Sequence, residues 1–229
     1  MSEELAFPPA VVLGLWLNAS VSSSVSSTDT ANAIETVTNQ VSIAGELSDV
    51  GSWLDLVQAV KSASTPVAVG LPVDGDPAGV PTDLLRTIQR PSGVVAINRD
   101  LLLVHRLDGA WTLVARSNTV LHYDLNQSRR ILNEQVSTSA QQLAASELVG
   151  DDSQILELLE EFRSLHLPPH LSNRSTEALE TAARIMIVAR GAIESSIALH
   201  SPSLDGLRLQ SLEQLITKSR AVLQSVVTD

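Results

Sequence analysis

Two carboxylates in one short loop are the residues of this chain with the clearest chemical potential. Asp74 and Asp76 lie in the run Asp74-Gly75-Asp76-Pro77-Ala78-Gly79, directly after an apolar segment. Carboxylates at this spacing can hold a hard cation, or one of them can act as a general base. The glycines would let a ligand approach the main chain closely. Since Asp, Gly and Pro are also the usual residues of an exposed turn, the loop is a candidate ligand site with a structural turn as the alternative.

The histidines and serines do not form a second recognisable site in the sequence. His166 and His170 have the spacing of metal ligands on a helix, but the two prolines between them prevent that helix. His105 is expected to cover a sheet face or to bond Thr112. A serine nucleophile is not indicated, since no Gly-x-Ser-x-Gly turn occurs. We therefore assign no catalytic residue, no cofactor and no metal ligand beyond the candidate ligand loop with Asp74 and Asp76, and we expect that the protein is not an enzyme.

Composition sets the class of protein. The chain has 229 residues, of which 44% are hydrophobic, so it has enough apolar material for a globular core. It has no cysteine, which excludes disulfides, thiolate nucleophiles and thiolate metal sites. A net charge of -11 argues against a nucleic-acid partner, because phosphate backbones are bound by clustered cations.

The N-terminus predicts a cytoplasmic protein. It begins Met1-Ser2-Glu3-Glu4, which is acidic where a signal peptide is basic. The apolar stretch from Ala10 to Leu17 is too short to span a bilayer. We therefore expect no membrane association. The bias of the basic residues towards arginine is consistent with a bacterial source.

Three helices are predicted before the first strand. Pro8-Pro9 precedes an apolar run, and proline is tolerated in a first helical turn because its missing N–H would be unpaired there. This favours a helix over residues 9–21, although the alternation from Leu13 to Val21 leaves a strand as the alternative. Good N-cap residues predict a second helix over residues 27–39. A stripe of apolar residues on one face predicts a third helix over residues 49–61.

A small sheet is predicted next, over residues 66–71, 93–97, 101–107 and 110–116. Asp108-Gly109 suits a two-residue type I′ hairpin, whose central residues need positive φ. That register places Arg106 opposite Trp111 and His105 opposite Thr112, so the guanidinium could lie on the indole ring.

The rest of the chain has helical periodicity. Helices are predicted over residues 126–148, 151–165 and 176–199 and from residue 207 onward, the last with Arg220 on its outward face. The third is apolar over most of its circumference and is expected at the centre of a bundle. Its face with Ile185, Val188 and Ala192 is expected to dock either on the sheet or on a second copy of the chain.

These elements predict an α+β fold, in which N-terminal helices with a small, mostly antiparallel sheet are followed by a C-terminal antiparallel helical bundle. The predicted division is an α+β domain over residues 1–125 and a helical domain over residues 126–229. The sequence leaves open whether the two parts are separate domains.

Two segments carry a resemblance. The run Leu167-Pro168-Pro169-His170-Leu171-Ser172, followed by Leu179 and Ala182-Ala183-Arg184, together with the segment from Leu71 to Gly79, resembles conserved actinobacterial proteins that carry no assigned activity. The resemblance implies a two-part protein, α+β and then helical, of unknown function. It transfers no catalytic residue.

The preferred interpretation is a non-enzymatic cytosolic interaction or scaffold protein that self-associates, as a homodimer, while any other protein partner is unknown. The surplus of apolar helix surface and the lack of a reactive group of residues motivate it. The alternative is a small-molecule- or divalent-cation-binding protein, or an enzyme, with its site at residues 74–79.

Overall fold

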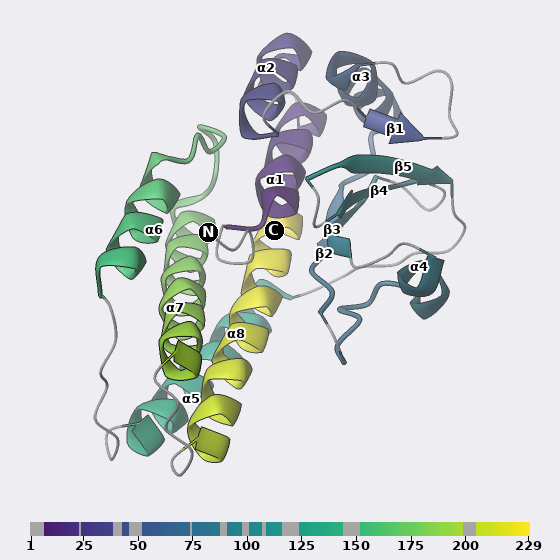
Figure 1. The fold of residues 1–229 in the computed structure, drawn as a ribbon. Helices are drawn as coiled ribbons and strands as arrows, with labels where there is room; N and C mark the ends of the chain where they lie inside the picture. Colours follow the sequence, from purple (N-terminus) through teal and green to yellow (C-terminus); the bar gives the residue numbers. More distant parts are fainter. Residues whose placement is uncertain are drawn as a thin grey trace.

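The computed structural model describes residues 7–22, 24–38, 43–45, 52–73, 75–87, 91–97, 101–106, 109–115, 124–143, 152–198 and 205–229. Within them lie the helices α1 (Pro9–Val21), α2 (Ser27–Val37), α3 (Trp53–Ala63), α4 (Thr82–Thr87), α5 (Leu125–Leu143), α6 (Asp152–Ser164), α7 (Asn173–Ala198) and α8 (Asp205–Thr228), and the strands β1 (Ile43–Gly45), β2 (Ala68–Gly70), β3 (Pro91–Ala96), β4 (Leu101–Arg106) and β5 (Trp111–Ala115). The fold is α+β, as predicted: a small sheet lies beside a group of long C-terminal helices (Figure 1).

The sheet has the strand order β1-β5-β4-β3-β2. β1 is parallel to β5, and all other neighbouring strands are antiparallel, so the predicted mostly antiparallel sheet is confirmed. The four predicted strands correspond to β2 through β5. Sequence analysis did not predict the three-residue strand β1 or the short helix α4, because neither is long enough to show a period.

Both faces of the sheet are covered. Val95, Leu103 and Leu113 belong to the main core with α1 and α3, whereas Val94 and Val104 pack with Val80 and with Leu85 of α4. Successive residues of a strand point to opposite faces. A sheet that is covered on both sides therefore has apolar residues at consecutive positions, which is the pattern of these strands.

The hairpin between β4 and β5 differs from the prediction. His105 lies opposite Trp111, Arg106 N–H donates to Ala110 O (2.9 Å), and Gly109 N–H donates to Arg106 O (3.0 Å). Three residues rather than two therefore connect Arg106 to Ala110. The predicted pairing of Arg106 with Trp111 is wrong, and it is the ring of His105 that contacts Trp111. Gly109 does have the positive φ (80°) that the turn signal implied.

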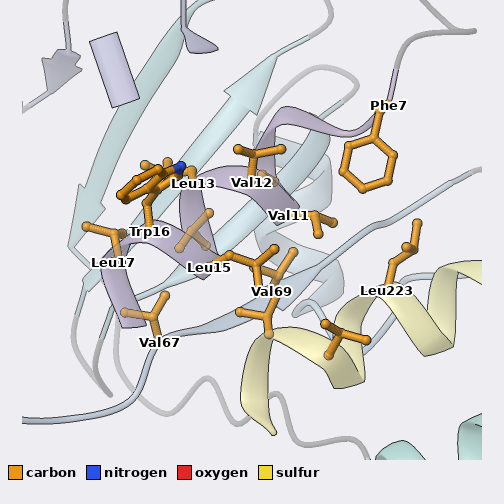
Figure 2. Close-up of a cluster of buried hydrophobic side chains, with 14 of the residues drawn as sticks. Phe7, Val11, Val12, Leu13, Leu15, Trp16, Leu17, Val67, Val69 and Leu223 are labelled. Carbon is orange, nitrogen blue, oxygen red and sulfur yellow. The ribbon is translucent and has the colours of Figure 1, made fainter. Parts of the chain in front are cut away.

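α1 is buried on all sides. The predicted helix over residues 9–21 is confirmed and the strand alternative is wrong. The helix is apolar around most of its circumference, and such a helix requires neighbours all round. Figure 2 shows Val69 of β2 and Leu223 of α8 beside it. Gly14 allows the closest approach, because its Cα faces the side chains of Val69 and Val227.

Among the C-terminal helices, α8 rather than α7 packs against the most elements. It packs against α5, α7, α1 and β2, whereas α7 packs mainly against α6 and α8 (Figure 1). The expectation of α7 at the centre of the bundle is therefore only partly met. α8 was a poor candidate in the sequence because its buried surface includes polar residues, above all Arg220, which is 2% exposed although it was predicted to point outward.

The two predicted parts share one buried core. The main cluster of buried apolar residues extends from Phe7 to Val227 and includes residues of the sheet and of the C-terminal helices. The predicted boundary falls in the first turn of α5, which begins at Leu125. The division into two domains stays a prediction. Among the described helices, none combines the length and apolarity that a membrane crossing requires.

Candidate functional site

The candidate ligand loop is a tight, internally bonded turn. Val73 and Asp76 exchange two main-chain hydrogen bonds of 3.0 Å, with Gly75 between them at φ 83°. Ala78 and Gly79 also have positive φ, of 49° and 77°. Asp74, the first of the two candidate carboxylates, lies outside the described residues. The loop therefore has the backbone of a structural turn, and the remaining question concerns the carboxylate of Asp76.

Both oxygens of Asp76 have partners within the chain. Oδ1 accepts a hydrogen bond from the N–H of Ala78 (3.0 Å), which stabilises the turn. Oδ2 lies 3.6 Å from Nη1 of Arg220, whose side chain is 3% exposed, while that of Asp76 is 43% exposed. The loop thus does meet the helical part, through an ion pair with α8. A guanidinium at this distance opposes a cation on the same carboxylate, because the two positive charges repel each other.

Arg220 belongs to a face of α8 that lies along the edge of the sheet. One turn further, Gln224 donates its Nε2–H to Val69 O (3.3 Å), and Val227 contacts Gly14. β2 is an edge strand, and the outer main-chain groups of such a strand need partners when they are buried. Gln224 supplies one of these partners from the helix.

Asn18 of α1 supplies further partners, for the main chain of Val67 directly before β2 and for Val227. Its Oδ1 accepts a hydrogen bond from Val67 N–H (2.6 Å), and its Nδ2 donates to Val67 O (2.8 Å) and to Val227 O (2.5 Å). One side chain therefore connects α1, the residue before β2 and the last turn of α8. We refer to Asn18, Asp76, Arg220 and Gln224 as the edge clasp.

The described polar side chains of the edge clasp have structural partners within the chain. Each of its side chains bonds or pairs with another part of the chain, so the arrangement holds the sheet edge to the helices. No group of three or more His, Cys, Asp or Glu side chains that could hold a metal ion occurs among the described residues. None of the edge-clasp contacts was foreseen, because the partners are far apart in the sequence.

The ion pair of the edge clasp predicts an asymmetry between two substitutions. Asp76→Ala removes the carboxylate from beside a buried guanidinium, and we expect a loss of about 2 kcal/mol of unfolding free energy. Arg220→Met keeps most of the buried side-chain volume, and the remaining Asp76 is exposed enough to be hydrated, so we expect the smaller loss, about 1 kcal/mol. Urea denaturation of both variants measures the two losses of unfolding free energy. A larger loss for Arg220→Met would contradict the assignment of Asp76 as a carboxylate that stabilises the buried guanidinium of Arg220.

A second contact of interest lies in the sheet. Oγ of Ser92 on β3 is 2.5 Å from Nδ1 of His105 on β4, and the His105 ring lies 4.5 Å from that of Trp111, measured between ring centroids. The sequence prediction had His105 covering the sheet or bonded to Thr112. Since Thr112 lies opposite Val104, the bond to Thr112 is wrong. No local motif links Ser92 to His105; only the strand pairing reveals the contact.

The other two histidines that the structure describes, His166 and His170, form no further site with partners in common. His166 stacks on Trp16 (ring centroids 5.6 Å apart, 14° between the planes), and its carbonyl oxygen accepts a hydrogen bond from Trp16 Nε1 (2.9 Å). His166 and His170 lie in the non-helical segment after α6, as the prolines predicted. His122 and His200 lie outside the described residues.

Comparison of the chain with protein-family models, with curated proteins and with solved structures found no match. The resemblance of the segments around residues 71–79 and 167–184 to actinobacterial proteins therefore stays an expectation. The candidate functions below rest on the geometry of this chain alone.

Proposed function

We propose that the protein is a non-enzymatic interaction or scaffold protein of the cytosol that self-associates through its C-terminal helices. The observation that carries the proposal is the exposure of large apolar side chains on these helices. Leu207 at the start of α8 is 75% exposed, Leu156 of α6 is 59% exposed and Val188 of α7 is 46% exposed. A contiguous exposed apolar patch is typical of a protein interface, and these three side chains come from helices that pack against one another.

The α7 face with Ile185, Val188 and Ala192 supports the same proposal. Ile185 and Ala192 are partly buried against Leu212 and Leu215 of α8, so the chain's own bundle, and not its sheet, covers part of this face. Val188 remains exposed. We assign this remaining apolar surface to contact with a second copy. An isologous contact is the usual form of a homodimer, since one patch then serves both subunits.

Val188→Glu tests the proposal. A carboxylate buried in the interface of each subunit should raise the dissociation constant of the dimer by about tenfold or more, equivalent to roughly 1.4 kcal/mol. The matched control is Val73→Glu, because Val73 is also 46% exposed but lies on the loop beside the sheet. Sedimentation velocity over a concentration series measures both. Equal effects of the two substitutions, or a strictly monomeric parent protein at roughly tens of micromolar, would contradict self-association through α7.

Ca²⁺ and Mg²⁺ titrations test the alternative of a divalent-cation site at residues 74–79. With Arg220 beside Asp76, we expect neither ion to change the thermal midpoint beyond what Na⁺ does at equal ionic strength. Saturation with a specific ligand at 100 times its Kd would stabilise the fold by about 2.7 kcal/mol, which is easily detected. Stabilisation by either ion that disappears in Asp76→Asn would favour the alternative function.

A further inference from the structure

The contact between Ser92 and His105 goes beyond an interaction role. The hydroxyl oxygen of Ser92 lies 2.5 Å from Nδ1 of His105 and 3.3 Å from the carbonyl oxygen of the same residue. The shorter contact directs the hydroxyl proton towards the imidazole when the ring carries its own proton on Nε2. Both residues are half-buried, so they are held in place and are still accessible from solvent. This is the arrangement of a serine beside a base.

A β-bulge brings Ser92 to this position. Pro91 lies opposite Arg106 and Gly93 lies opposite His105, so Ser92 is the extra residue in β3. A bulge re-aims a side chain and interrupts the ladder at that point. Here it turns the Ser92 hydroxyl towards His105. The strand is also fixed from the helix side, because a Cβ built on Gly93 would lie 2.6 Å from the Cβ of Ala10 in α1.

Trp111 packs against the imidazole of His105 and is itself packed by Trp53. The Trp111 ring lies 4.5 Å from that of His105 with 45° between the planes, and Trp111 is 1% exposed. Trp53 of α3 packs edge-on against Trp111, with ring centroids 6.0 Å apart and 86° between the planes. Since Trp111 is fixed by the core, the orientation of the His105 ring towards Ser92 is fixed as well. A base that is already oriented does not need to be ordered during proton transfer.

We propose that Ser92 is a covalent modification site, a nucleophilic serine that is activated by His105 and takes an acyl group from an activated acyl donor such as a thioester or an aryl ester. Oγ forms a bond to the acyl carbon while its proton moves to Nδ1. The bond from the acyl carbon to the leaving sulfur or oxygen breaks, and the leaving group takes the proton from Nδ1. The product is an O-acyl serine on the protein and a free thiol or phenol. This transfer requires no turnover, so it is compatible with a non-enzymatic interaction protein.

The charge of the chain favours acyl donors over phosphoryl donors. At a net charge of -11 the protein repels polyanions at long range. The reacting acyl group of a thioester or aryl ester is uncharged, whereas a phosphoryl group carries negative charges. The acyl group is thus the transferred group that the electrostatics favour.

The probe is p-nitrophenyl acetate on the full-length protein, followed by intact-mass and peptide mass spectrometry. The expected result is one acetyl group, located on Ser92, and a fluorophosphonate probe should label the same residue. Ser92→Ala should abolish the labelling. His105→Ala should slow it by about 10²-fold or more, the usual contribution of a positioned base. Free imidazole should restore part of the rate to His105→Ala, which a merely structural histidine would not allow.

Ser24→Ala is the matched control. Ser24 is also a half-buried serine, but its hydroxyl contacts the carbonyl oxygen of Ala19 (2.8 Å) and the hydroxyl of Ser22 (3.0 Å), and neither of these groups is a base that could activate it. Its replacement should leave the labelling rate unchanged. Because the label is mapped on the unsubstituted protein, a folding defect in a variant does not decide the result. An unlabelled Ser92 in that protein, or labelling spread evenly over several serines, would overturn the proposal without affecting the test of self-association.

Discussion

Gly14→Val is expected to lower the free energy of unfolding by about 3 kcal/mol, the upper part of the range for overpacking a filled core. The first added atom would lie 2.6 Å from Cγ2 of Val69 and 2.8 Å from Cγ1 of Val227. Both valines are buried, so neither can move into solvent. The clash would separate α1 from β2 and α8 at the centre of the core. Chemical denaturation measures the loss, and a fall in the thermal midpoint of about 6–12 °C should accompany it.

Gly206→Val provides the control for this substitution. Gly206 also lies in a helix, α8, but a Cβ built on it meets nothing within 4 Å. Replacing a glycine in a helix interior is favourable for helix propensity, and Gly206 lies in the first turn of α8 where this gain is smaller, so a larger loss at Gly14 must come from packing. We expect Gly206→Val to change the stability by no more than about 0.5 kcal/mol. Equal losses at the two positions would show that α1 does not pack as closely as described.

Asn18→Ala should cost about 3 kcal/mol of unfolding free energy, because it removes three hydrogen bonds from groups that have little access to water. The groups left without Asn18 are the N–H and carbonyl of Val67 and the carbonyl of Val227. Val67 is 0% exposed, so hydration would not replace the lost bonds unless the core opened. The measurement is urea denaturation followed by circular dichroism.

Hydrogen exchange would locate the effect of Asn18→Ala. The N–H of Val67 should lose protection, since its hydrogen bond to Oδ1 is removed, and residues at the end of α8 should exchange faster as well. Asn32→Ala on the exposed surface of α2 is the control, and we expect it to be neutral. A loss at Asn18 no greater than that at Asn32 would contradict the role of Asn18 in joining the sheet edge to the helices.

The hairpin illustrates why the strand register was not predictable. Leu101, Leu102, Leu103 and Val104 are all apolar, and both faces of the sheet are buried. A slip of one residue moves every side chain to the other face. When both faces are apolar, the hydrophobic pattern does not oppose such a slip. Packing of Trp111 against Trp53 places the indole in the main core, and this tertiary contact aligns Trp111 with His105 rather than with Arg106.

The turn at the candidate site was predicted from the sequence, whereas its contacts with the rest of the chain were not. The loop of residues 74–79 was correctly singled out as a turn that meets the helical part, because Asp, Gly and Pro have strong local preferences. The sequence could not predict which residue Asp76 contacts. Arg220 has the charge of a surface residue, and its burial depends on a carboxylate from a distant part of the chain. The pairing of Ser92 with His105 likewise depends on the bulge between two strands.

The sequence by itself determined the longer elements of this protein. The bounds of α1, the order of the longer helices and strands, and the end of α6 before Pro168-Pro169 all follow from patterns within a few residues, where local sterics and capping act. Only the tertiary structure decided how these elements meet: the register at His105, the burial of Arg220 and the position of α8 against the sheet edge. These three features depend on contacts between residues that are distant in the sequence. A local sequence pattern carries no information about the energies of such contacts.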